Sequence, residues 1–414
     1  MYKIAKNCRC CGSDELVKYL DLGLQPLANS YHKNTNMSAY FPLEVMLCQQ
    51  CFHSQLSIVV DPDLMFKNYL YVSGTTQTFR NHCEEFAEYV VGNHSSSKLT
   101  VLDIAANDGT LLKCFQELGC STIGVDPANN LNEISKANGI EVINEYWNEN
   151  AIRILNTRYF TNKVDVITGT NVFAHVDDTF SFLENCKKVL NDNGRIILEF
   201  PYCDKMIKNI EFDTIYHEHL SYFLVTSFAT LAYKVRLIID KVIQTPIHRG
   251  SIRFTLRKAE SLLDFHCEEA NALIQKEKKE GLLTLETYED FSKKIKENKI
   301  KFNDLLANMK NKNNFKIVGY GASAKGNTML NYFNVDLDYI VDDNPMKVEF
   351  NTPGRNIIIK KTSELKNENL APLAIVILSW NFYEEIKEKI KNIRNNEPCV
   401  LIKYVPTIDT EMCF

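Results

Sequence analysis

The sequence lacks any apolar run approaching the ~20 residues that span a bilayer, so we expect no membrane-spanning helix. Its first residues lack the apolar core of a signal peptide, and a cytoplasmic location is therefore expected. It also lacks an excess of positive charge, because 47 Lys and Arg residues stand against 52 Asp and Glu, a net charge of -5. This balance argues against nucleic acid and anionic membranes as partners.

With 414 residues, the chain is too long for one ordinary core, so two or three domains are expected. Between residues 66 and 258, apolar β-type runs alternate with helix-length segments, which predicts a mostly parallel α/β sheet of seven strands. Charged residues and helically spaced apolar residues at 259–312 predict an amphipathic helical connector. A second alternating unit at 313–408 predicts a smaller Rossmann-like α/β domain.

The cysteines are unevenly distributed: of thirteen, five fall within the first 51 residues. In a reducing compartment such a cluster indicates metal binding rather than disulfides. Two C-x-x-C pairs have the spacing of knuckles that place four thiolates around a structural Zn²⁺, leaving no open position for chemistry. The predicted ligands are Cys8, Cys11, Cys48 and Cys51. Cys10 and His53 are spare candidates, chance clustering is the alternative, and residues 1–65 form the predicted zinc-binding module, rich in short turns.

A strand-to-helix turn at residues 102–109 would let a ligand approach the backbone and rest on a helix N-terminus. An acidic residue followed by a turn of small residues is typical of S-adenosylmethionine (SAM) methyltransferases. The candidate cofactor-binding residues are Asp103, Ala105, Asn107, Gly109, Asp126 and Asn171. Asp126, about 20 residues further on, could accept both hydroxyl hydrogens of a ribose, as it also would from a nicotinamide dinucleotide. However, the turn lacks Gly-x-Gly-x-x-Gly and has Ala105 where glycine is usual, and an ordinary structural turn is the alternative.

The segment at residues 212–223 has two histidines, a glutamate and two tyrosines within seven residues. An imidazole with a pKa near 7 is suited to removing a proton at neutral pH. His217-x-His219 could instead bind a metal, although no third ligand is evident, and a purely structural cluster is the remaining alternative. His175 follows the fourth strand of the core, where α/β sheets bind ligands, but a structural histidine fits the residue type equally well.

These motifs resemble the three-domain sugar C-methyltransferases, which act on nucleotide-linked 4-keto-deoxyhexoses. The resemblance covers essentially the whole chain. It is carried by the paired C-x-x-C knuckles and by segments 21–27, 69–74, 106–109, 216–219, 246–253, 319–325 and 379–381. It implies a zinc-binding module, a SAM-binding core and a C-terminal domain that helps to bind the nucleotide and sugar, with Lys325 and its loop as contributors.

By position, the resemblance implies that His219 is the general base. It would remove a proton from C3 beside the C4 ketone, and the resulting enolate carbon would attack the SAM methyl group. The residues expected around the reacting sugar are Glu218, Tyr216, His175 and Tyr71, with Tyr69 as an alternative to Tyr71. Asp126 would hold the SAM ribose, Asn107 and Gly109 would line its amino-acid end, and His217 is given no role.

The partner expected from this resemblance is a nucleotide-linked keto-deoxy sugar, in deoxysugar or surface-glycan biosynthesis, and the chain is expected to be a monomer. The first alternative is an O- or N-methyltransferase acting on another nucleotide sugar or glycan precursor. The others are a non-catalytic binding protein with a degenerate SAM fold, and a nicotinamide-dependent sugar oxidoreductase using the glycine-containing loop at 319–325.

Overall fold

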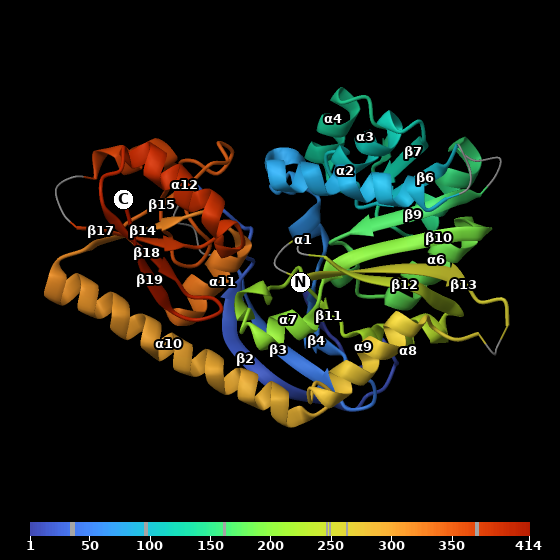
Figure 1. Cartoon of the computed structure of the whole chain (residues 1–414), viewed down its shortest axis with the longest axis horizontal. Helices are drawn as coiled ribbons and strands as arrows, with labels where there is room; N and C mark the ends of the chain where they lie inside the picture. The colour runs from blue at the N-terminus through green and yellow to red at the C-terminus, as the bar shows by residue number, and fades with distance from the viewer. Residues whose placement is uncertain are drawn as a thin grey trace.

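The computed structural model describes residues 1–33, 38–94, 98–159, 163–245, 247, 250–261, 264–368 and 372–414. Three sheet-based bodies make up the molecule, with the N-terminal sheet at the base and the two α/β domains on either side above it (Figure 1). Pro246, His248 and Arg249 of the 246–253 motif lie outside the described residues. Within the described part of the chain, no helix is both long and apolar enough to cross a membrane.

The N-terminal body is built on two long antiparallel strands rather than on short turns. Its four-stranded sheet has the order β11-β4-β3-β2. These strands are β2 (Leu16–Pro26), β3 (Tyr40–Cys48), β4 (Ser54–Leu56) and β11 (Ser221–Tyr222). A separate ladder pairs β1 (Tyr2–Ile4) with β5 (Ile58–Val60), and the short helix α1 (Asp63–Phe66) follows. Because β11 comes from the segment directly after His219, the N-terminal sheet holds one end of that segment.

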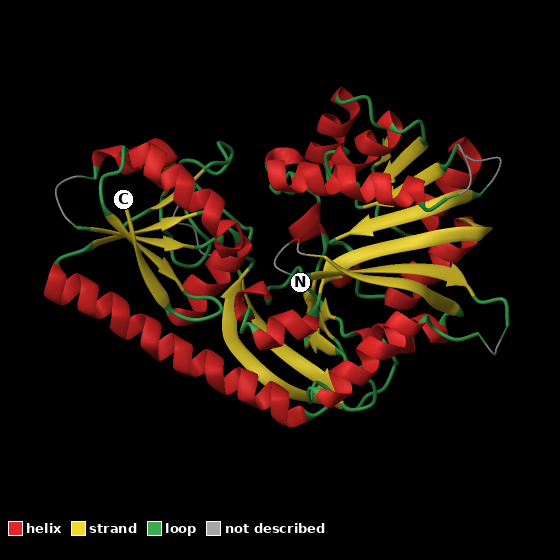
Figure 2. Cartoon of the chain, viewed as in Figure 1, coloured by secondary structure: helices red, strands yellow, loops and turns green. Residues whose placement is uncertain are grey.

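The central body is a doubly wound sheet of seven strands, which confirms the predicted fold class. Its order is β12-β13-β10-β9-β6-β7-β8, and only the pairings of β13 are antiparallel. The strands are β6 (Thr100–Ile104), β7 (Ser121–Val125), β8 (Val142–Ile143), β9 (Val164–Thr170), β10 (Leu190–Pro201), β12 (Leu237–Thr245) and β13 (Ser251–Lys258). Its helices are α2 (Gln77–Gly92), α3 (Thr110–Glu117), α4 (Asn129–Ala137), α5 (Glu149–Ile154), α6 (Thr179–Val189), α7 (Cys203–Lys208) and α8 (Val225–Lys234). Helices lie on both faces of this sheet (Figure 2), so its strands read as apolar runs.

The C-terminal body is the predicted second α/β unit, with a six-stranded sheet of order β16-β15-β14-β17-β18-β19. The strands are β14 (Lys316–Tyr320), β15 (Ile340–Asp342), β16 (Ile359–Lys361), β17 (Leu373–Ile377), β18 (Cys399–Lys403) and β19 (Asp409–Cys413), and the helices include α11 (Ala324–Phe333) and α12 (Tyr383–Arg394). The sheet continues past residue 408, because β19 pairs antiparallel with β18.

Two helices, α9 (Glu268–Lys279) and α10 (Leu285–Asn313), form the connector where a single long amphipathic stretch was expected. The buried face of α10 includes the predicted apolar positions Tyr288, Phe291 and Ile295. The Tyr288 ring lies 5.0 Å from the ring of Tyr19 in β2, so α10 packs against the N-terminal sheet. It then continues along that sheet to the C-terminal body (Figure 1).

Candidate active site

One cavity of about 1230 Å³ is lined by all three bodies. Its walls include the carboxyl ends of β6, β7 and β9 in the core and of β14 and β15 in the C-terminal domain, where parallel sheets bind ligands. Most small-molecule sites measure ~300–1,000 Å³, so this cavity has room for two ligands. The predicted site residues that line it are Tyr71, Asp103, Ala105, Asn107, Asp126, Asn171, His175, Tyr216 and His219. The other two predicted residues, Gly109 and Glu218, are not among the residues that line the cavity.

The turn after β6 has an unusual backbone at the position where the sequence departs from the usual glycine. Ala105 has φ 61°, in the left-handed region, and its N–H donates to the carbonyl oxygen of Val125 at 2.7 Å. An alanine in this conformation costs roughly 1–2 kcal/mol. Asn107 is also left-handed, at φ 52°, as is Gly109 at φ 81°, where a Cβ atom would lie 2.9 Å from Ile140. The turn is thus fixed immediately before α3.

Asp126 is held in place by the turn that it faces. Its two carboxylate oxygens accept backbone N–H groups from Asn107 at 2.9 Å and from Ala128 at 2.8 Å. Burial raises the pKa of Asp126. Asp103 accepts the hydroxyl hydrogen of Thr168 at 2.6 Å, and burial raises its pKa to about 7. These carboxyl groups therefore lie together at the strand ends.

His219 has one ring nitrogen fixed by the backbone. Its Nδ1 lies 2.7 Å from the carbonyl oxygen of Thr214, and a carbonyl can only accept a hydrogen bond. Nδ1 therefore carries a hydrogen, and Nε2 has the lone pair of the neutral ring. Nε2 accepts the hydroxyl hydrogen of Tyr216 at 2.8 Å. This arrangement leaves Nε2 as the basic atom of the neutral ring.

Tyr216 and His175 are the neighbours of this imidazole. The His175 and His219 ring centroids are 5.0 Å apart, and those of Tyr216 and His219 are 4.0 Å apart. Burial, together with the charge of Glu218, raises the pKa of Tyr216 well above its ordinary value, so its hydroxyl stays protonated and acts as a donor. Burial lowers the pKa of His175 to about 4, so His175 is neutral at pH 7.

Glu218 precedes His219 in the chain and is buried, with only 3% of its surface exposed. Its carboxylate accepts hydrogen bonds from Asn29 Nδ2 at 2.7 Å and from the Tyr69 hydroxyl at 2.9 Å, and burial raises its pKa to about 7. Tyr69 and Tyr71 both line the cavity, with their ring centroids 6.3 Å apart. The Tyr69 hydroxyl is engaged by Glu218, whereas the Tyr71 side chain is 46% exposed.

The other two histidine candidates, His217 and His53, contact strands of the N-terminal sheet. His217 is 1% exposed, and its Nε2 lies 3.2 Å from the carbonyl oxygen of Pro42. His53 is fully buried, and its Nε2 lies 3.1 Å from Ser221 Oγ. The structure thus separates His217 from His219, although only one residue lies between them in the sequence.

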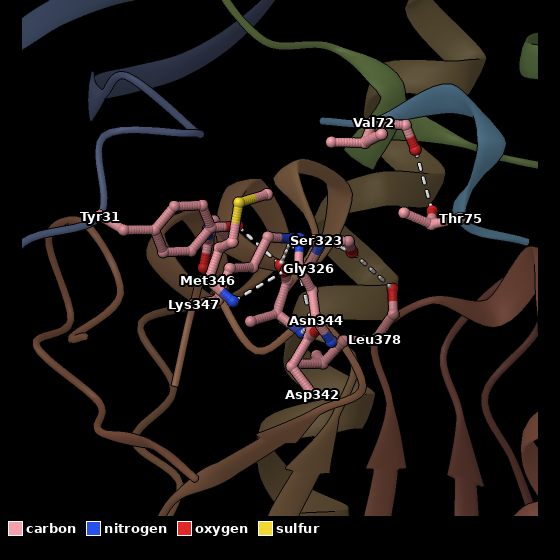
Figure 3. Close-up of polar contacts among 12 residues, drawn as sticks. Tyr31, Val72, Thr75, Ser323, Gly326, Asp342, Asn344, Met346, Lys347 and Leu378 are labelled. Atoms are coloured by element: carbon pink, nitrogen blue, oxygen red, sulfur yellow. Dashed lines mark hydrogen bonds and ion pairs between the residues drawn. The ribbon is translucent and has the colours of Figure 1, made fainter. Parts of the chain in front are cut away.

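On the opposite wall, the turn after β14 leads into α11. Gly321 has φ 87°, and a Cβ atom there would lie 2.3 Å from Ser379 Oγ, so glycine is required. The Ala322 N–H donates to Asp342 Oδ2 at 2.6 Å. The Tyr31 hydroxyl and Lys347 Nζ both donate to the carbonyl oxygen of Ala322, at 2.6 and 2.7 Å, and both side chains point to this part of the loop (Figure 3).

Sequence reasoning did not identify the residues that join the bodies around the cavity. Asn29 and Tyr31 lie in the N-terminal body with no motif to mark them, and their partners are about 190 and 290 residues away along the chain. Asp342 could have been identified from the sequence, because it ends the second strand of the C-terminal unit, just as Asp126 follows the second strand of the core.

Apart from the cavity, the four predicted zinc ligands come together in the N-terminal body. Their sulfur atoms lie within 4.8 Å of one another, with Cys8 and Cys51 at 3.5 Å and Cys11 and Cys48 at 3.5 Å. Four thiolates around a tetrahedral Zn²⁺ require S–S separations of about 4 Å, so the set fits the metal. Cys10 lies two residues after Cys8, and its backbone N–H donates to Cys8 Sγ at 3.4 Å.

Comparison with known proteins agrees with this geometry. Three protein families match successive parts of the chain. Residues 8–66 match a zinc binding domain, residues 76–235 match a methyltransferase domain, and residues 246–406 match a C-methyltransferase C-terminal domain. The C-methyltransferase NovU of Streptomyces niveus is 27% identical over 398 residues, which cover 94% of this chain and 93% of NovU. A ubiquinone biosynthesis O-methyltransferase of Haemophilus ducreyi is 28% identical over 102 residues, 24% of this chain and 43% of that protein.

Among solved structures, an S-adenosylmethionine-dependent methyltransferase from Clostridium acetobutylicum superposes with a TM-score of 0.34 at 12% identity, covering 43% of this chain and 90% of that chain. The matches to the methyltransferase domain and the C-methyltransferase C-terminal domain define a methyltransferase. The chain is a SAM-dependent C-methyltransferase with three domains: the zinc-binding module, the methyltransferase core and the C-methyltransferase C-terminal domain.

Proposed function

We propose that this enzyme methylates a nucleotide-linked 4-keto-deoxy sugar at C3, the carbon beside the ketone, for deoxysugar or surface-glycan biosynthesis. The observation that carries the proposal is the fixed imidazole of His219. Its Nδ1–H is held by Thr214, which leaves the lone pair on Nε2, and His219 lines a cavity whose walls come from both α/β domains. A positioned base is what methylation at carbon requires, because a C–H group is not nucleophilic until its proton is removed.

The proposed proton transfer uses His219 and Tyr216 together. The C3 proton passes to His219 Nε2, and the electron pair of the C–H bond moves into the C3–C4 bond as the ketone oxygen becomes an enolate oxygen. Tyr216 turns its hydroxyl from Nε2 to this oxygen, which frees the lone pair of the base and stabilises the developing charge. The raised pKa of Tyr216 supports this role, because the hydroxyl remains a donor at neutral pH.

The core domain would hold SAM, which supplies an electrophilic methyl carbon. The free lone pairs of the Asp126 carboxylate would accept the ribose hydroxyls, since its backbone contacts fix it at the strand end. Asn107 and Gly109 would line the amino-acid end beside the start of α3, and Asp103, Ala105 and Asn171 would complete this wall. Enclosure by the C-terminal domain would exclude water and align the two reactants.

The C-terminal wall would hold the nucleotide. Lys325 is the first-turn cation of α11, and its Nζ lies 4.3 Å from the Trp380 ring centroid. A lysine at the start of a helix supplies positive charge and backbone N–H groups for a phosphate. On this wall Lys325, Lys347 and Lys389 balance the acids Asp342, Asp343 and Glu385. The core wall has an excess of acids, among them Asp103, Asp108 and Asp126, and this excess favours a cationic sulfonium there over an anionic diphosphate.

The test is incubation of the protein with SAM and a panel of 4-keto-deoxy sugar nucleotides. We expect a product heavier by one methylene unit, with the new methyl group on C3 by NMR, and release of S-adenosylhomocysteine. A methyl group on oxygen or nitrogen would overturn C-methylation of this substrate class and favour the O- or N-methyltransferase alternative.

A further inference from the structure

Asp213 is a buried carboxylate at the junction between the C-terminal domain and the segment that carries the histidine. It lies in the turn η4 (Phe212–Thr214) and has no exposed surface. Its Oδ2 accepts hydrogen bonds from Trp380 Nε1 at 2.6 Å and from the Tyr404 hydroxyl at 2.7 Å. Both donors belong to the C-terminal domain and are 1% exposed. The contact therefore joins two bodies through charge-assisted hydrogen bonds.

A buried carboxylate is a costly way to dock two domains. Its second oxygen, Oδ1, has no hydrogen-bond partner among the residues that the structure describes. Burial raises the pKa of Asp213, and the charge of Lys325 acts in the opposite direction. Leaving such a group buried and incompletely paired costs free energy that an apolar contact would avoid. The aromatic contact beside it, Phe212 stacked on Phe333 with centroids 5.0 Å apart, already supplies apolar docking.

The same turn fixes the proposed base. Thr214, the next residue, supplies the carbonyl oxygen that holds His219 Nδ1 at 2.7 Å. Beyond the histidine, the segment is fixed on the opposite side, because Leu220 O accepts from Arg9 Nη1 at 3.2 Å and β11 pairs with β4. We therefore expect a displacement of Asp213 to move the Thr214 carbonyl while the far end of the segment stays in place.

We propose that Asp213 is a positioning residue that couples the C-terminal domain to the orientation of His219. Trp380 contacts both Asp213 and the Lys325 cation, so the wall proposed for the nucleotide and the turn that holds the base share one side chain. Docking of the C-terminal domain sets the Thr214 carbonyl, and this carbonyl keeps the hydrogen on Nδ1 and the lone pair on Nε2. The inference rests on the proposed role of His219 as base.

The test compares Asp213→Ala and Asp213→Asn with Tyr383→Phe. Tyr383 is a matched control because it is also buried and its hydroxyl also donates to a carboxylate, that of Glu411, at 2.7 Å, but this contact lies within the C-terminal domain. The first readout is ¹⁵N NMR of the histidine rings in the intact protein, which reports the tautomer without any substrate. We expect Asp213→Ala to lose the Nδ1–H state of His219 and Asp213→Asn, whose amide oxygen still accepts, to retain most of it.

The second readout is the rate of C3 hydrogen exchange on a keto-sugar nucleotide. We expect kcat to fall roughly 10- to 100-fold in Asp213→Ala with KM little changed, since small displacements of a reacting group have effects of this size. Asp213→Asn should recover most of kcat, and Tyr383→Phe should equal the wild type. An unchanged His219 tautomer in Asp213→Ala would overturn the inference. If only the proposed function were wrong, the His219 tautomer would still change in Asp213→Ala, but the wild-type protein would exchange no C3 hydrogen.

Discussion

The two α/β domains each present a loop of similar backbone structure to the cavity, from opposite sides. In the core, Ala105 N–H donates to Val125 O at 2.7 Å, and in the C-terminal domain Gly321 N–H donates to Val341 O at 2.8 Å. In both domains, an acid at the end of the next strand accepts hydrogen bonds from two backbone N–H groups. Asp126 accepts from Asn107 and Ala128. Asp342 accepts from Ala322 and Asn344.

The two loops differ in what surrounds them. Acidic side chains outnumber basic ones on the core side of the cavity, whereas on the C-terminal side Lys325, Lys347 and Lys389 balance Asp342, Asp343 and Glu385. The C-terminal loop also has its Ala322 carbonyl covered by Tyr31 and Lys347. One backbone design thus serves two proposed ligands, a cationic methyl donor and an anionic nucleotide. What distinguishes them is side-chain charge and the packing around the loop, which fits the rule that function lies in the site rather than in the fold.

A third buried carboxyl, Glu218, differs from the two loop acids, because side chains rather than backbone N–H groups are its donors. Burial raises its pKa from 4.5 to about 7, so the folded protein holds this proton more tightly than the unfolded chain. The free energy of unfolding therefore falls as pH rises from about 4.5 to 7, by about 3 kcal/mol from this group.

Glu218→Gln removes that dependence. As the pH rises from 4.5 to 7.5, the wild type should lose about 3 kcal/mol of unfolding free energy relative to the variant, as measured by urea unfolding at each pH. Glu88→Gln, on an exposed position of α2, is the control and should follow the wild type. Parallel pH profiles for the wild type and Glu218→Gln would contradict the raised pKa.

The matched loop carboxylates give the next largest effect. Asp126→Asn should lower the affinity for SAM roughly 10- to 100-fold while leaving the affinity for the sugar nucleotide unchanged, because a hydrogen bond to a charged group contributes about 1.5–3 kcal/mol. Asp342→Asn should do the reverse by loosening the loop at Ala322. Isothermal titration calorimetry with each ligand separates the two. If both substitutions weakened the same ligand, the assignment of one ligand to each loop would be wrong.

The smallest effects come from the two left-handed positions that the loops share. Gly321→Ala should lower the free energy of unfolding by about 2 kcal/mol, since the new Cβ meets Ser379 in a conformation that alanine avoids. Ala105→Gly should raise it by about 0.5–1 kcal/mol, because relief of strain exceeds the added chain entropy. Thermal or urea unfolding of the pair checks both signs, and a loss of stability in Ala105→Gly would exclude the strain at Ala105.

The sequence allowed the local features of this molecule to be predicted. The two C-x-x-C pairs predicted a four-thiolate cluster, and the alternation of apolar runs predicted both α/β sheets, because these patterns depend on short spacings. Asp126 was identifiable because it follows the second core strand at a usual distance from the turn. The long strands β2 and β3 were missed because several turn-forming residues interrupt their apolar pattern.

Contacts between distant segments could not be read from the sequence. Asn29 reaches Glu218, and Tyr31 reaches Ala322, only because the chain folds the N-terminal body against both α/β domains. Asp213 is part of a segment that the sequence did single out, but its partners Trp380 and Tyr404 follow it by 167 and 191 positions. The roles proposed for the site residues remain predictions.

The most direct measurement is hydrogen exchange in heavy water with a 4-keto-deoxy sugar nucleotide and no SAM. If His219 is the base between the two loops, the wild type should place deuterium at C3, and His219→Asn should do so at least about 100-fold more slowly with unchanged SAM affinity. Equal exchange rates in the wild type and His219→Asn would contradict the account.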